Sequence, residues 1–162
     1  MTSYQLLVSA RRTTTMLAAA LLITSLMIWA PAPASAAGGF ETEDLRIESG
    51  TGADQVELDV TLYIPNSASE SAPAAAIIFP HGYGGTKKQL SGQATKFARE
   101  GYFGVTYTAR GFGESTGEVS INAPDYEVAD ARTLIDLLSE RPEVLQDAPG
   151  DPRVGILGGS YG

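Results

Sequence analysis

The chain ends with Val154-Gly155-Ile156-Leu157-Gly158-Gly159-Ser160-Tyr161-Gly162. Residues 154–157 form a short, mostly apolar run, which is typical of a buried strand. They lead directly into the pattern Gly-x-Ser-x-Gly, in which a serine occupies a sharp turn between a strand and a helix, and small flanking residues avoid a collision with it. We therefore predict a strand followed by a nucleophile elbow, with Ser160 as the nucleophile and Gly158 and Gly162 shaping the turn.

The same pattern occurs earlier, as Gly113-Glu114-Ser115-Thr116-Gly117. A short pattern of this kind arises by chance in a glycine-rich chain, so its context has to distinguish the two copies. Ser160 follows a predicted strand at once, whereas Ser115 lies within a loop, where we expect its hydroxyl to close a local turn. For Ser160 the alternative is a turn that binds an anion through its backbone N–H groups.

Strand patterns precede the elbow. Apolar residues recur at every second position over residues 56–64, which predicts a half-buried strand, and residues 40–48 alternate more loosely. Residues 74–79 form a continuous apolar run, as expected of a parallel strand covered on both faces. Residues 102–107 are the next predicted strand.

Helical patterns lie between these strands. Leu90, Ala94, Phe97 and Ala98 fall at helical spacing, and Gly101 is placed to end that helix. A second helix is expected to begin near Pro124, to bury a stripe of side chains and to stop at Pro142; the stripe is Val128, Ala131, Ile135 and Leu138. Alternation of strands and helices after a β lead-in predicts an α/β sheet with helices on both faces.

A serine nucleophile needs a base, an orienting acid and hydrogen-bond donors for the oxyanion. In an elbow one donor is the N–H of the next residue, here Tyr161, and another comes from the loop after an earlier strand. That loop reads His81-Gly82-Tyr83-Gly84-Gly85, and its glycines let the backbone approach a ligand closely. We expect Tyr83 to be the second donor, through its N–H or its hydroxyl.

Three segments together resemble the opening half of an α/β-hydrolase, most closely the Xaa-Pro dipeptidyl-peptidase family, which also contains cocaine-esterase-like hydrolases. They are the loop beginning at Pro80, the Arg-Gly loop of residues 110–117 and the elbow. The resemblance runs from about residue 43 to the end. It implies antiparallel lead-in strands, then a mainly parallel sheet, with Ser160 as nucleophile, Tyr161 N–H in the oxyanion hole, and Tyr83 matching the family's tyrosine donor.

The resemblance also implies a loop-shaping role for His81 and Gly82, and shows one departure, Thr108 in place of a common aspartate. In this fold the triad follows the order Ser, Asp, His, so the acid and the base are expected beyond Gly162. His81 is the one histidine of the chain, and a role as base is the disfavoured alternative. Three earlier aspartates are expected to be solvated; they are Asp130, Asp136 and Asp147. Residues 37–162 are therefore predicted to be a partial α/β-hydrolase domain, truncated at the elbow, inactive and poorly folded as written.

The first 36 residues have the layout of a secretory signal peptide. Arg11 and Arg12 precede an apolar run over residues 16–30, and Ala34-Ser35-Ala36 forms an A-x-A cleavage site. An uncleaved anchor is the alternative, but the run is shorter than the roughly 20 residues of a spanning helix. We expect cleavage near Ala36, only transient membrane contact, and a secreted, periplasmic or cell-wall location, by either the general or the twin-arginine route.

Composition narrows the function. With 19 acidic residues against 11 Lys plus Arg and no cysteine, the chain lacks the charge for nucleic-acid binding and the thiols for disulfides or Cys-based zinc sites. We expect no cofactor and no metal. Two classes remain: an exported serine hydrolase that transfers the acyl group of a small peptide or ester to Ser160, and a non-catalytic binding module or inactive remnant of the same fold.

Overall fold

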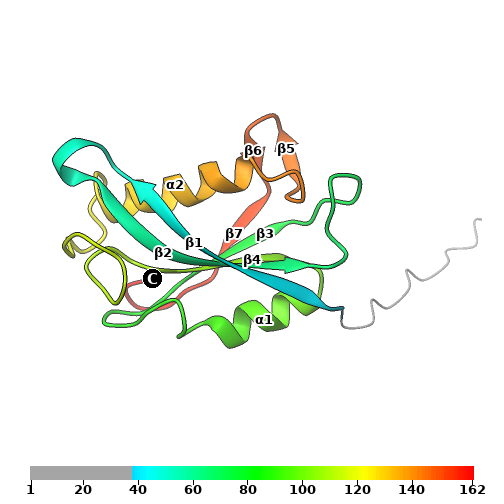
Figure 1. Cartoon of the computed structure of the whole chain (residues 1–162), viewed down its shortest axis with the longest axis horizontal. Coiled ribbons are helices and arrows are strands. Elements are labelled where there is room, and N and C mark those ends of the chain that lie inside the picture. Colours follow the sequence, from blue (N-terminus) through cyan, green and yellow to red (C-terminus); the bar gives the residue numbers. More distant parts are fainter. Residues whose placement is uncertain (1–37) are drawn as a thin grey trace, which may run out of the picture. The chain divides into compact units, whose positions relative to one another are not determined.

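The computed structural model describes residues 38–162, so the predicted signal peptide lies outside the described residues. A five-stranded mixed sheet forms the centre, in the order β1-β2-β4-β3-β7 (Figure 1). Its strands are β1 (Phe40–Ser49), β2 (Val56–Pro65), β3 (Ala76–Pro80), β4 (Phe103–Thr108) and β7 (Val154–Ile156). β2 runs antiparallel to both β1 and β4, while β3 runs parallel to β4 and β7. The predicted antiparallel lead-in and parallel continuation are confirmed.

Two helices cover opposite faces of this sheet (Figure 1). On one face, α1 (Ser91–Arg99) packs Ala94 and Ala98 against Phe79. On the other, α2 (Glu127–Ser139) packs Leu134 and Leu138 into the larger core cluster, which contains Ile78. Neighbouring strand residues point to opposite faces, which is why Ile78 and Phe79 serve different layers.

Short elements complete the described chain. A 3₁₀ turn, η1 (Gly52–Asp54), joins β1 to β2. A small antiparallel ribbon, β5 (Gln146–Ala148) with β6 (Asp151–Pro152), precedes β7. Within residues 38–162 no helix has the length and apolarity needed to cross a bilayer.

The end of α1 lies where the sequence predicts it. Gly101 has a φ of +94°, its N–H bonds the carbonyl of Ala98 at 3.1 Å, and the N–H of Tyr102 bonds the carbonyl of Phe97 at 3.0 Å. These two bonds form a Schellman motif, which needs the left-handed conformation that glycine adopts without strain. The chain therefore leaves α1 directly into β4.

The predicted stripe of α2 is only partly correct. Leu138 is buried, but Val128, Ala131 and Ile135 are half-buried, and the helix begins at Glu127 after a turn closed by the carbonyl of Ala123. The face that packs most deeply is Glu127, Asp130, Leu134 and Leu138. Hydrophobic periodicity misplaces this face because its first two members are carboxylates, and they are buried only because nearby loops supply their partners.

Candidate active site

The loops that follow β3, β4 and β7 meet at the carboxyl edge of the sheet, because these three strands run parallel. The β3 loop touches the β4 loop through His81, whose Nε2 accepts the N–H of Ala109 at 2.9 Å. It also approaches the elbow, since a Cβ on Gly82 would lie 3.7 Å from the carbonyl oxygen of Gly159. The three segments singled out in the sequence therefore form one site.

Ser160 occupies a strained turn. Its φ is +62°, a left-handed value that costs a non-glycine residue of order 1–3 kcal/mol, and its side chain is exposed. A Cβ on Gly158 would lie 2.7 Å from Cγ of Pro80, and a Cβ on Gly162 would lie 2.6 Å from the carbonyl oxygen of His81. Both glycines of the pattern are therefore required by the close approach of the elbow to the end of β3.

Tyr83 and Tyr161 lie side by side at this edge. Their rings meet edge to face at 5.8 Å, and Phe112 packs against both, at 5.2 Å from Tyr83 and 5.7 Å from Tyr161. Neither backbone N–H bonds an acceptor within residues 38–162, whereas the N–H of Gly82 is taken by the Gln89 side chain at 2.9 Å. The two N–H groups expected to bind an oxyanion are thus free of other described partners.

His81 is only 2% exposed, and both of its ring nitrogens are engaged. Nδ1 donates to the carbonyl oxygen of Gly82 at 2.7 Å, and Nε2 accepts the N–H of Ala109. This arrangement fixes the tautomer of the ring and leaves neither nitrogen to take a proton from Ser160. The geometry fits a role in shaping the loop.

The second copy of the pattern lies in a structural position. Ser115 is buried, and its hydroxyl donates to the carbonyl oxygen of Thr108 at 2.6 Å and accepts the N–H of Asp59 at 2.9 Å. These bonds tie the Arg-Gly loop to β4 and β2, which is more than the closing of a local turn. Because the hydroxyl is buried and both donates and accepts a hydrogen bond within the structure, it is not available as a nucleophile.

Asp130 corrects the expectation of a solvated carboxylate. Asp130 and Arg110 have 1% and 2% of their side chains exposed, and they form a bidentate pair with distances of 2.6 and 2.7 Å. The hydrogen bond to Asp130 raises the pKa of Arg110, against the effect of burial. Asp136 and Asp147 are exposed as predicted. Thr108 stands where the family pattern commonly has an aspartate, and its hydroxyl accepts the N–H of Lys87 at 3.0 Å.

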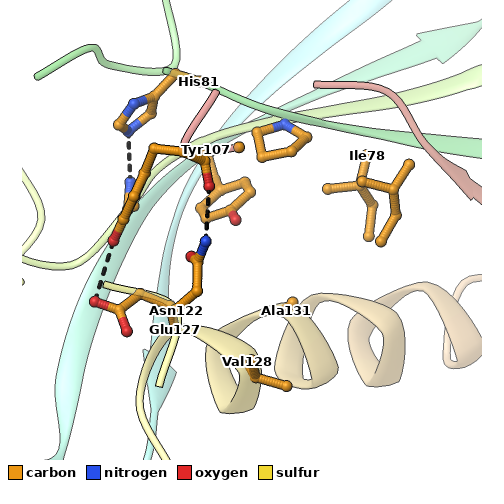
Figure 2. Close-up of a pocket in the computed structure, with 12 residues that line it drawn as sticks. Ile78, His81, Tyr107, Asn122, Glu127, Val128 and Ala131 are labelled. Atoms are coloured by element: carbon orange, nitrogen blue, oxygen red, sulfur yellow. Dashed lines mark hydrogen bonds between the residues drawn. The ribbon is translucent and has the colours of Figure 1, made fainter. Parts of the chain in front are cut away.

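Glu127 is a site residue that the sequence reading missed. It is 6% exposed, and both Glu127 and Asn122, labelled in Figure 2, bond Tyr161 of the elbow. Burial acts to raise the pKa of Glu127, but hydrogen bonds from Ser120 and Ala123 outweigh it and lower the pKa to about 2. Tyr161 donates its hydroxyl to this carboxylate, and burial together with that contact raises the pKa of Tyr161 above its ordinary range.

A pocket of about 210 Å³ lies between α2 and the sheet, next to the elbow (Figure 2). Its lining is mostly apolar and includes Ile78, Val128, Ala131, Ile156 and Tyr161. Tyr161 and Gly162 of the elbow line it, and Ser160 does not. Among residues 38–162, no three His, Cys, Asp or Glu side chains are grouped as a metal site requires.

The mixed sheet, the covering helices and the elbow define an α/β-hydrolase fold. Residues 54–162 match the family model described as X-Pro dipeptidyl-peptidase (S15 family), and the chain belongs to this hydrolase family. No curated protein sequence matches the chain. The resemblance drawn from the three sequence segments is therefore confirmed.

Solved structures share the fold. A hypothetical protein from Pseudomonas aeruginosa is 25% identical with a TM-score of 0.58, over 77% of this chain and 36% of that one. An esterase from Pyrococcus furiosus is 20% identical (TM-score 0.54; 74% and 40% covered), and a Butyrivibrio proteoclasticus protein with ferulic acid bound is 17% identical (TM-score 0.57; 73% and 43% covered). The chain thus spans 36–43% of the length of these three structures.

Proposed function

We propose that this protein is a serine hydrolase that forms an acyl-enzyme at Ser160 with a peptide or ester substrate. The observation that carries the proposal is the left-handed Ser160, exposed on a turn shortly after β7, with Gly158 and Gly162 at positions where a Cβ would collide with neighbouring atoms. A strained, exposed serine at a strand end is the feature that an elbow requires.

In the proposed reaction, Ser160 Oγ attacks the substrate carbonyl carbon while its proton passes to a histidine base. The carbonyl oxygen becomes an oxyanion, which the N–H of Tyr161 and a donor from Tyr83 stabilise. Collapse of the tetrahedral intermediate expels the protonated amine or alcohol and leaves the acyl-enzyme, which water then hydrolyses. Both nitrogens of His81 are engaged, so His81 is not proposed as this base.

The family match favours a peptide with proline in the second position, and the esterase among the structural neighbours makes an ester the second substrate class to test. The predicted signal peptide supports export. A non-catalytic binding module of the same fold remains the competing proposal. The two proposals differ in that a binding module needs no nucleophile.

A fluorophosphonate probe tests the proposal on the full-length protein, the product of the complete reading frame. Wild type should be labelled, and Ser160→Ala should not. Ser115→Ala is the matched control, because it removes the serine of the second pattern and should keep labelling. Unlabelled wild type, or labelling that survives Ser160→Ala, would refute the nucleophile. The chain ending at Gly162 should stay unlabelled. Hydrolysis rates of Xaa-Pro anilides, compared with those of simple aryl esters, then decide the substrate class.

A further inference from the structure

Two side chains bond Tyr161: Asn122, in the turn before α2, and Glu127, the first residue of α2; both are labelled in Figure 2. The Tyr161 hydroxyl donates to Oε1 of Glu127 at 3.1 Å, and Nδ2 of Asn122 donates to the Tyr161 carbonyl oxygen at 3.0 Å. One contact fixes the side chain and the other fixes the backbone. Together they restrict how the residue after Ser160 is oriented, and therefore where its N–H points.

Glu127 is held rigidly for this purpose. Its carboxylate accepts the N–H and the hydroxyl of Ser120, each at 2.6 Å, and the N–H of Ala123 at 3.0 Å. The Tyr161 hydroxyl is the fourth donor. The bonds from Ser120 and Ala123 already hold the buried carboxylate of Glu127 in one orientation. It therefore accepts the Tyr161 hydroxyl without a further loss of its own side-chain entropy.

The backbone that presents Asn122 is strained. Ile121 and Asn122 have φ values of +56° and +57°; asparagine tolerates the left-handed region better than most residues, but such a value is costly for the β-branched Ile121. The Ile121 side chain is 75% exposed, so packing does not compensate the strain. Hydrogen bonds hold the turn instead: Asn122 bonds Tyr161, and the N–H groups of Ser120 and Ala123 bond Glu127.

We propose that Glu127 and Asn122 are positioning residues of this enzyme, which hold Tyr161 so that its N–H points at the oxyanion formed beside Ser160. The inference rests on the proposed function of Ser160. The residues touch Tyr161 and no reacting atom, so their effect is on the placement of a donor. Because an oxyanion donor acts mainly in the transition state, loss of its placement should lower kcat more than it raises KM.

The test is a double-mutant cycle in the full-length protein with Glu127→Gln, Tyr161→Phe and the double variant. Gln replaces one acceptor oxygen by an amide that faces two donors, whereas Phe removes only the hydroxyl and keeps the backbone N–H. We expect each single variant to lower kcat by about 10- to 100-fold, the scale of a misplaced catalytic group, with KM changed less than about threefold. The double variant should be no worse than Glu127→Gln, because both act through one contact.

Asp125→Asn is the matched control, since it removes an exposed carboxylate from the turn before the same helix and should leave kcat unchanged. Unchanged kcat in Glu127→Gln and Tyr161→Phe, or strictly additive effects, would overturn the inference. If Glu127→Gln fails to fold, Asn122→Ala decides: a lower kcat at constant KM supports the inference and an unchanged kcat refutes it. If the fluorophosphonate does not label the wild-type protein, Ser160 is not a nucleophile. That result would refute the proposed function, and this inference with it.

Discussion

At the scale of single residues, the elbow depends on space as much as on the serine. Gly158 and Gly159 are neighbours with opposite surroundings: a Cβ on Gly158 meets Pro80 and Gly162, while a Cβ on Gly159 meets nothing within 4 Å. Gly158→Ala should therefore destabilise the full-length protein by about 1–3 kcal/mol through overpacking, and Gly159→Ala should not. Urea unfolding of the two variants measures the difference. Equal stabilities would show that the elbow is not packed against β3.

Glu127 should make the protein sensitive to acid. Its pKa is about 2 in the folded state, against an ordinary value of 4.5, so folding favours the ionised carboxylate. The stabilisation is complete above about pH 4.5 and is lost as the pH falls towards 2, with a maximum of roughly 3 kcal/mol. Unfolding free energies measured across that interval should fall for wild type. In Glu127→Gln this part of the pH dependence should vanish; a profile identical to wild type would contradict the assigned contacts.

The site residues that the sequence predicts are those that belong to a local pattern. The glycine-serine turn follows from the residues within it, and the β3 loop follows from its glycines. The sequence does not predict Glu127 and Asn122 as site residues, because their role depends on contacts with Tyr161, which is remote in sequence. The sequence did contain one signal for Glu127. Glu127 and Asp130 are three residues apart and share a helix face with Leu134, so two carboxylates lie on the face that packs against the core.

At the scale of elements, the pair of Arg110 and Asp130 connects the Arg-Gly loop to α2. Removing one partner leaves a buried charge, so Asp130→Ala should cost about 3–5 kcal/mol of stability in the full-length protein. Asp136→Ala, on the exposed face of the same helix, should change stability by no more than about 0.5 kcal/mol. Chemical denaturation gives both values. Similar losses in the two variants would mean that the ion pair contributes nothing specific.

Elements whose pattern is apolar were predictable with nearly correct ends. The alternation over residues 56–64 is β2, and Gly101 ends α1 because only local geometry is involved. The α2 face was predictable only in part, since two of its four buried residues are carboxylates, and the partners that allow their burial lie outside the helix. The ribbon of β5 and β6 has no hydrophobic signature, because it is short and largely exposed.

At the scale of the whole molecule, the order β1-β2-β4-β3-β7 is a property of the family fold more than of any single pattern. Periodicity identifies strands, but it does not say which strands are neighbours. The resemblance carried by the three loops implied antiparallel lead-in strands and a mainly parallel continuation, and both are present. The order of the strands in the sheet comes from the structure alone.

The predicted export signal bears on the whole molecule, because its removal must spare the fold. The first described strand begins at Phe40, and cleavage near Ala36 leaves all ten residues of β1 in place against β2. We expect the exported protein to begin at or near Ala37, which intact-mass measurement of protein recovered outside the cytoplasm will show. Ala36→Phe should block processing, because the cleavage site requires a small residue, while Phe40→Leu, beyond the site, should be processed normally. An exported wild-type protein that retains Arg11 and Arg12 would instead indicate an uncleaved anchor.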